Sequence, residues 1–483
     1  MINTAVLSKF GANDIAVDKG RKTGVAVIAL AFIWLLIALA VLDLAGISFM
    51  GLLIVSNATF LIFPLIWRAA AGSLDMFEPL LITNASLGGM MIGRPLADLV
   101  SGRFVEHGYS VFPAFSQALV VVALASLALQ IGYFSPFPSI FALVLPRLSG
   151  SFHARSAALY ALCLAIVGLT AYSVFLLGQG GIHFLILMLA GRSKSVTEGM
   201  FASSGYLYGA LGFLTPAAII FLGCWVRTRR PIYLVATLIS GAPQLVIMGA
   251  QGSRSGMIGL LFAFPMVWFL SKNQRPSLIQ IGIGAFILMA AFGFIRTHRD
   301  ADTHGKSTQT SSDLVDSALS IFQSDDDEMF DVTALEVLNV PRFIPYHHFG
   351  VITDIIVRAV PRQLYPNKRV DISTEFFQAM WPGRAHATHS RGGAAPSLIG
   401  DFYMDSGIIT VVFWMVVLGG ILRTSWNWFL SNQSSMNALL IYAVVPATTI
   451  GLLRATFAGS IAAGLFSALP LLILPAVMKI RMR

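Results

Sequence analysis

The chain has 483 residues, of which 56% are hydrophobic and only 11% are charged. A soluble domain carries about 25% charged residues, so this composition excludes a water-soluble protein and predicts an all-α, polytopic integral membrane protein. The net charge of +9 does not indicate nucleic-acid binding, because the sequence has no basic stripe or nucleic-acid-binding motif. Cys163 and Cys224 both lie in apolar segments, which predicts buried thiols rather than a disulfide framework or a metal cluster.

Twelve apolar runs have about the length that a helix needs to cross a bilayer. They lie at 24–42, 47–67, 79–100, 111–133, 157–177, 206–226, 231–250, 256–271, 278–295, 408–422, 436–453 and 456–477. Lys and Arg number 16 in the segments that this topology places on the side of the termini, against five in the short segments on the other side. This asymmetry predicts that both termini are cytoplasmic. The first run lacks a clear cleavage site, which predicts an uncleaved first helix.

Residues 296–407 interrupt this pattern with a polar stretch of 112 residues, which holds 25 of the 55 charged residues and six of the nine histidines. The predicted topology places it outside, as a periplasmic loop between an N-terminal bundle of about nine helices (1–295) and the C-terminal helices (408–483). A structureless loop of this length would be unusual. We therefore expect an amphipathic helix over Ser311–Asn339 and a second helix over His347–Val360.

The predicted outer side is rich in arginine, and a guanidinium binds phosphate oxygens in a bidentate way without losing its charge. The candidates for binding a lipid pyrophosphate are Arg192, Arg254, Arg358, Arg362, Arg384 and Arg391. Arg192 follows a glycine-rich turn (178–181) and an apolar run (183–190) that is too short to span. Arg254 lies in a Gly-Ser-Arg-Ser-Gly turn (252–256) at the membrane edge. The alternative is that each arginine pairs with a local acid or a lipid headgroup.

The loop closes with the motif Pro396-Ser-Leu-Ile-Gly-Asp-Phe-Tyr-Met-Asp-Ser-Gly407, which leads directly into the span at 408–422. Asp401 is expected near the membrane surface, where a carboxylate accepts a proton from a sugar hydroxyl. His389 is the rival candidate for this base, because an imidazole titrates near neutral pH. The structural alternatives for Asp401 are a helix cap and a partner for an arginine.

Three further groups of polar residues favour structural interpretations. The Asp325–Glu328 run lacks the spacing of an EF-hand loop and predicts a solvated face. His347 and His348 point different ways on a helix, which argues against a shared metal. Arg94 and Asp98 lie four residues apart and predict a local ion pair, with a lipid-headgroup site as the alternative. No P-loop and no HExxH motif is present, which argues against an ATP-driven pump.

The sequence resembles the Wzy-type polymerases of bacterial O-antigens and exopolysaccharides, also called oligosaccharide repeat-unit polymerases. The resemblance lies in the many spans, the one large outer loop late in the chain, and three motifs. The motifs are the Gly-Ser-Arg-Ser-Gly turn, Ile-Ile-Val-Arg-Ala-Val-Pro-Arg-Gln-Leu-Tyr-Pro-Asn-Lys (355–368) and the closing motif. The topology match covers nearly the whole chain, and the residue match is limited to these motifs. The family usually shows an acid after the glycine near the end of the loop, as Asp401 does here. It often shows Lys-Pro after the mid-loop proline, whereas this chain has Lys368 followed by Arg369.

The resemblance implies a GT-C-like membrane glycosyltransferase of the bacterial inner membrane that uses no metal and no cofactor. Its partners would be undecaprenyl-pyrophosphate-linked glycans, together with a flippase and a chain-length regulator of the same pathway. Fixed arginine charges would stabilise the leaving pyrophosphate. Two alternatives stay open: an O-antigen ligase that uses lipid A core as the acceptor, and a flippase or other transporter. A flippase would be expected to carry its charges in a central cavity and would not need the 112-residue loop.

Overall fold

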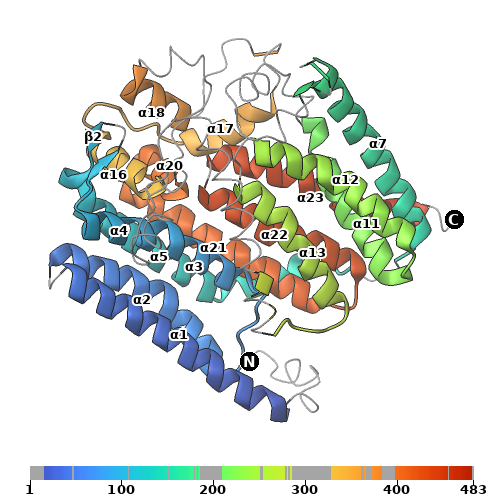
Figure 1. Cartoon of the computed structure of the whole chain (residues 1–483), viewed down its shortest axis with the longest axis horizontal. Coiled ribbons are helices and arrows are strands. Elements are labelled where there is room, and N and C mark those ends of the chain that lie inside the picture. The colour runs from blue at the N-terminus through green and yellow to red at the C-terminus, as the bar shows by residue number, and fades with distance from the viewer. Residues whose placement is uncertain are drawn as a thin grey trace.

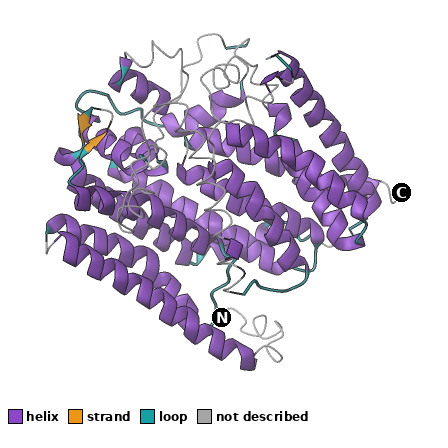
Figure 2. Ribbon diagram, in the orientation of Figure 1, coloured by secondary structure: helices purple, strands orange, loops and turns teal. Residues whose placement is uncertain are grey.

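The computed structural model is almost entirely helical in the parts of the chain that it describes (Figures 1 and 2). These parts are residues 16–45, 48–106, 108–148, 152–178, 180–181, 183–184, 209–250, 254–277, 280, 283–284, 328–360, 364–365, 372–382, 397–454 and 456–480. Strand β1 (Val105–Glu106) pairs with β2 (Tyr109–Ser110) in a short antiparallel hairpin.

Nine helices in the described residues are long and apolar enough to cross a membrane. They are α1 (Ala16–Ala45), α2 (Phe49–Ala70), α5 (Phe112–Phe134), α7 (Ala154–Gly178), α11 (Leu214–Thr228, with the crossing counted from Gly209), α12 (Pro231–Ala250), α21 (Ile408–Ser431), α22 (Met436–Arg454) and α23 (Phe457–Ile480). Each coincides with a predicted span, since a run of about 20 apolar residues satisfies both the hydrocarbon thickness and the backbone hydrogen bonds. The chain is therefore an all-α, polytopic membrane protein.

The predicted span at 79–100 is helical over its whole length, but it differs from the nine membrane-crossing helices in its regularity and in its buried polar side chains. It is divided into α3 (Pro79–Gly88), a π-helical turn η2 (Gly89–Gly93) and α4 (Arg94–Ser101). Several of its polar side chains are buried against neighbouring helices; the amide of Asn84, for example, donates to a backbone carbonyl of α2 at 2.8 Å. Such side chains replace the apolar surface that a lipid-facing span would carry.

Two other predicted spans do not reach a full crossing in the described residues. The run at 256–271 forms α13 (Arg254–Ser271), whose apolar part, Leu260–Ser271, is shorter than a bilayer crossing requires. The run at 278–295 lies almost wholly outside the described residues. The total of twelve spans stays a prediction.

The predicted inner loops meet at one end of the helix bundle. Arg275 pairs with Asp75 at 2.6 Å, and both Arg68 and Arg423 reach Glu78, at 2.9 and 3.3 Å. At the opposite end, α5, α21 and α23 begin beside the helices of the large loop (Figure 1). The structure thus separates the two predicted sets of connections, while the assignment of the first set to the cytoplasm stays a prediction.

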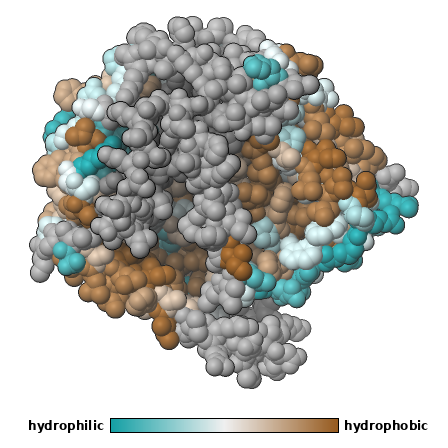
Figure 3. All heavy atoms as spheres, in the orientation of Figure 1, coloured by the Kyte–Doolittle hydropathy of each residue, from teal (hydrophilic) through white to brown (hydrophobic). Residues whose placement is uncertain are grey.

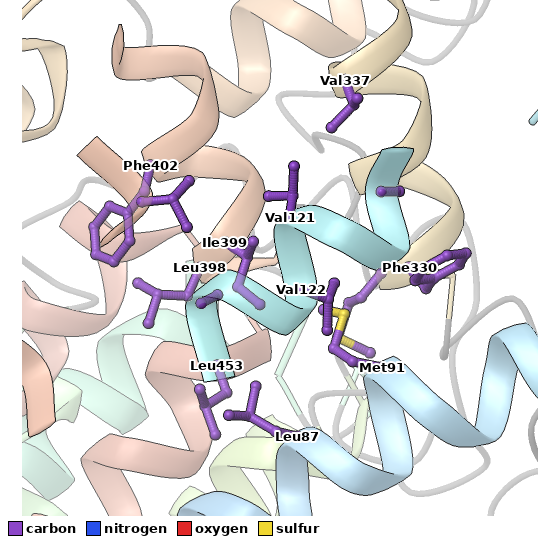
Figure 4. Close-up of a cluster of buried hydrophobic side chains, with 14 of the residues drawn as sticks. Leu87, Met91, Val121, Val122, Phe330, Val337, Leu398, Ile399, Phe402 and Leu453 are labelled. Carbon is purple, nitrogen blue, oxygen red and sulfur yellow. The ribbon is translucent and has the colours of Figure 1, made fainter. Parts of the chain in front are cut away.

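The large loop contributes four helices, α16 (Met329–Asn339), α17 (Gly350–Ala359), α18 (Ile372–Met380) and α20 (Leu398–Ser406). Figure 4 shows how α16 and α20 pack on the membrane bundle. The cluster comprises Phe330 and Val337 of α16, Val121 and Val122 of α5, Leu398, Ile399 and Phe402 of α20, and Leu87, Met91 and Leu453. The described part of the loop therefore shares one hydrophobic core with the membrane helices, so burial of apolar area fixes it in place.

Three expectations for the loop need correction. The described helix α16 is buried on all sides rather than amphipathic. Residues 311–327, which carried the amphipathic pattern, lie outside the described residues. Glu328 is buried, so a solvated face is wrong for this end of the Asp325–Glu328 run. The second helix starts at Gly350, three residues later than predicted, because Phe349 takes the left-handed conformation with φ of +60°.

Large hydrophobic side chains cover outward faces of several long helices, as the brown areas over α7 and α12 in Figure 3 illustrate. These faces suit a hydrocarbon solvent. Cys224 is buried and its thiol contacts the Ala154 carbonyl oxygen at 3.4 Å, as expected for a structural thiol. Cys163 lies on the exposed face of α7, which corrects the prediction that both thiols are buried.

The turn after α7 confirms the role predicted for its glycines. Gly180 and Gly181 have φ of +112° and +66°, and the amide of Gly181 donates to the carbonyl of Leu176 at 2.7 Å. Residues with a Cβ rarely adopt these angles, so the glycines let the chain leave the helix sharply.

Candidate functional site

The closing motif of the loop folds as α20, a helix of nine residues whose ends are fixed by the motif itself. Ser397 caps the N-terminus, since its hydroxyl accepts a hydrogen bond from the amide of Gly400 at 3.0 Å. Gly407 ends the helix with φ of +75°, and a Cβ there would lie 2.9 Å from the Tyr346 hydroxyl. The motif therefore holds Asp401 in the first turn of a short, rigid helix that leads into α21.

Asp401, which was expected near the membrane surface, is buried, with 4% of its surface exposed. Its Oδ2 atom accepts a hydrogen bond of 2.6 Å from the backbone amide of Phe457, the first residue of α23. A helix N-terminus favours a negative charge, because its first amides lack partners within the helix. Asp401 thus caps a helix, as one structural interpretation proposed, but the helix belongs to a segment 56 residues away.

A small pocket of about 10 Å³, which is room for about one water molecule, lies beside Asp401. Its lining residues come from α17, α18, α20 and the start of α23: Val351, Asp354, Ile372, Ser373, Asp401, Thr456, Phe457 and Ala458. Asp354 helps to shape it, since its Oδ2 accepts a hydrogen bond from the amide of Ile372 at 3.1 Å. Two acids and two hydroxyl residues are among these lining residues, so a single hydroxyl group or water molecule suits the pocket in size and in hydrogen bonding.

A second acid, Glu336 of α16, lies next to Asp401 and is missing from the candidates that the sequence suggested. It has no exposed surface, and neither carboxyl oxygen has a hydrogen-bond partner in the described part of the chain. Burial raises the pKa of Glu336 well above its ordinary value, and the neighbouring charge of Asp401 raises it further. The sequence signal that could have identified Glu336 is an acid within the mainly apolar run at residues 329–337.

A different acidic cluster surrounds Arg94, which is buried with 2% exposure. Its guanidinium bonds to Asp98 at 3.1 Å, Glu106 at 2.9 Å and Asp331 at 2.6 Å. The predicted ion pair with Asp98 is confirmed, and the lipid-headgroup alternative is wrong because carboxylates surround the guanidinium. Burial raises the pKa of Asp331, while the charge of Arg94 opposes this shift. The cluster ties α16 of the loop to α4 and β1.

The other candidate residues are located only in part. Arg254 is the first residue of α13, and Arg358 lies in the last turn of α17, the helix that also supplies Val351 and Asp354 to the pocket. Their side chains are not described. The remaining candidates fall outside the described residues: Arg192, Arg362, Arg384, His389 and Arg391. The structure therefore places Asp401 in a pocket with α17 but does not test the convergence of the arginines.

The adjacent histidines contact the loop rather than each other. His348 Nδ1 lies 2.9 Å from the Ser406 hydroxyl, and the backbone amide of His347 donates to the Met404 carbonyl. Within the described ranges, no group of three His, Cys, Asp or Glu side chains is arranged to hold a metal ion.

Comparisons with protein-family models, curated proteins and solved structures find no match to this chain. The structure itself defines the class: a polytopic membrane protein with a polar, helical loop packed on one end of its bundle. An inference about activity therefore depends on the chemistry of the Asp401 pocket and on the sequence motifs.

Proposed function

We propose that this chain is a membrane glycosyltransferase that polymerises oligosaccharide repeat units, carried on undecaprenyl pyrophosphate, into a surface polysaccharide. The reaction would take place on the periplasmic face of a bacterial inner membrane, with both chain termini in the cytoplasm. The likeness of three motifs to the Wzy-type polymerases supports the proposal, and so does the predicted topology with one large outer loop.

The observation that carries the proposal is the position of Asp401. It lines a small pocket at the junction between the loop helices and the membrane bundle. The amide of Phe457 at a helix N-terminus favours its ionised form. An ionised carboxylate at this junction is suited to accept a proton from the hydroxyl of a sugar that a membrane lipid delivers.

In the proposed reaction, Asp401 takes the proton of the acceptor hydroxyl while the hydroxyl oxygen bonds to the anomeric carbon of the donor sugar. The bond between that carbon and the pyrophosphate oxygen breaks, and its electron pair leaves with undecaprenyl pyrophosphate. Arg254 and the other outer arginines stabilise the charge that develops on the leaving oxygen. His389 is the alternative base if Asp401 has only a structural role.

Deletion of the gene in its bacterial host, followed by sizing of the surface glycan, tests the proposed activity. A polymerase deletion is expected to leave single repeat units exported but not joined. Polymer that accumulates on the lipid carrier without transfer to lipid A core would identify a ligase instead. Loss of all surface glycan would identify a flippase, and either of these two results would contradict the proposal.

The pyrophosphate role of Arg254 predicts a large effect from a conservative change. Arg254→Lys keeps the charge but loses the bidentate fork, so we expect polymerisation to fall on the order of 10²-fold, as when a transition-state donor is removed. Arg103→Lys, at an exposed arginine of another predicted outer segment, is the matched control and should leave the rate unchanged. Polymer yields and expression that are equal for the two variants would exclude the bidentate role.

A further inference from the structure

Glu336 occupies an unusual position for an acid. It has no exposed surface, and neither of its carboxyl oxygens has a hydrogen-bond partner within the described ranges. An ionised carboxylate in such a place would lose its hydration and gain no donor in return. The neutral acid is far less costly to bury, so the position favours the protonated form.

Gly400 leaves room for the Glu336 carboxyl group. A Cβ atom at Gly400 would collide with Oε2 of Glu336 and would lie 2.7 Å from its Cδ atom. Only a residue without a side chain allows the carboxyl group to rest against this part of α20. Because Asp401 is the next residue, the two acids are neighbours although they come from different helices of the loop.

The two acids are held in unequal ways. Asp401 accepts a hydrogen bond from the amide of Phe457 at the N-terminus of α23. Among the residues that the structure describes, no such donor reaches Glu336. Two carboxyl groups in close, dry surroundings do not both ionise near neutral pH, and the proton stays on the group whose charge is stabilised less.

We propose that Glu336 and Asp401 form a carboxyl pair that holds one proton, with the proton on Glu336 and the negative charge on Asp401. This inference rests on the proposed function, in which Asp401 is the base. It makes Glu336 a positioning residue: as a neutral neighbour it leaves the charge on Asp401, which then receives the proton of the acceptor hydroxyl.

The other charged groups on the elements around Glu336 do not change this assignment. Among the described elements, those that pack most extensively against α16 are α5, α20, η2 and α4. The only ionisable residue of α5 is Tyr133, which donates to Glu78 at the far end of that helix, and η2 has none. On α4, Arg94 and Asp98 meet Asp331. On α20, besides Asp401, the ionisable residues are Tyr403 and Asp405, and on α16 itself they are Asp331 and Glu336.

Infrared spectroscopy of the purified full-length protein tests the proton position directly, because a protonated carboxyl group has its own carbonyl stretching band. The difference between wild type and Glu336→Gln at neutral pH should contain this band. Asp401→Asn should keep it, since the proton remains on Glu336. Loss of the band in Asp401→Asn but not in Glu336→Gln would overturn the proposal, as would a difference spectrum that shows an ionised carboxylate on Glu336. If Glu336→Gln does not fold, Glu336→Met, of similar length, gives the same comparison.

A double substitution tests the geometry independently. Gly400→Ala should lower the yield of folded protein severalfold, because the new methyl group collides with the Glu336 carboxyl group. Gly400→Ala combined with Glu336→Ala should restore the yield; no restoration would contradict the contact. Neither test uses polymerisation, so the pair can be upheld when the deletion experiment rejects the polymerase, and the polymerase can be upheld when the pair is rejected.

Discussion

Asp331 and Glu336 lie five residues apart on α16, and both are buried, yet their charged neighbours differ. Asp331 meets the guanidinium of Arg94 at 2.6 Å. The charged neighbour of Glu336 is the carboxyl group of Asp401, and the oxygens of Glu336 have no hydrogen-bond partner in the described part of the chain. Burial alone therefore does not decide how strongly the ionised form of an acid is disfavoured. The partner does, because a cation stabilises the ionised form and a neighbouring carboxylate destabilises it.

The Arg94 cluster connects residues that are far apart in the sequence. Its Nε donates to Asp331, 237 residues away, at 2.8 Å, and its Nη2 donates to Glu106 at 2.9 Å. Breaking a buried ion pair leaves an isolated buried charge, which has a high free-energy cost. A buried ion pair therefore stabilises a fold chiefly relative to the state in which one partner is missing. The cluster thus fixes the loop helix that carries Glu336 against the bundle.

Removal of Arg94 should have the largest effect. Arg94→Met leaves buried carboxylates without their cation, and such a loss costs about 3–5 kcal/mol. We expect a strongly lowered midpoint of thermal unfolding in detergent. The matched control is Arg275→Ala, which breaks the partly exposed pair with Asp75 and should cost about 0–1 kcal/mol. Equal midpoints for the two variants would remove the structural role assigned to the cluster.

A smaller effect should appear in the dependence of stability on pH. The pKa of Glu336 is raised above its ordinary value of 4.5, so the folded state binds more protons than the unfolded state in the window above that value. Its contribution to stability is complete below this value and is lost as the pH rises toward the pKa of the folded state. Relative to Glu336→Gln, the wild type should lose about 1.4 kcal/mol per pH unit across this window. Parallel curves for the two proteins would show that Glu336 does not titrate in this way.

The long helices were predictable from the sequence, because the bilayer demands runs of about 20 apolar residues whatever the neighbours are. The end of α21 shows where this reasoning fails. The predicted span stops at residue 422, before Arg423, whereas the helix continues to Ser431. Arg423 pairs with Glu78 at 3.3 Å and lies over the ring of Tyr133. A charge does not end a helix when another helix supplies its partner.

The candidate site was predictable only where its signal is local. The closing motif marked Asp401 at the end of the loop, but its contact with Phe457 joins residues 56 positions apart and has no trace in the sequence. Glu336 was missed for the same reason. Its significance comes from Gly400, whose missing side chain makes room for the carboxyl group, and periodicity does not reveal such a pairing between two helices.

Polymerisation by the purified protein, reconstituted with lipid-linked repeat units, tests the central claim that Asp401 is the base. Asp401→Asn should lower the rate by about 10² to 10⁴, the usual contribution of a general base, while the protein stays folded. Asp405→Asn is the control: this acid is also buried on α20, but it accepts a hydrogen bond from the amide of Val351, and an asparagine can still do so. Its rate should stay close to that of the wild type. An Asp401→Asn protein that polymerises at the wild-type rate would contradict the account and transfer the role of base to His389.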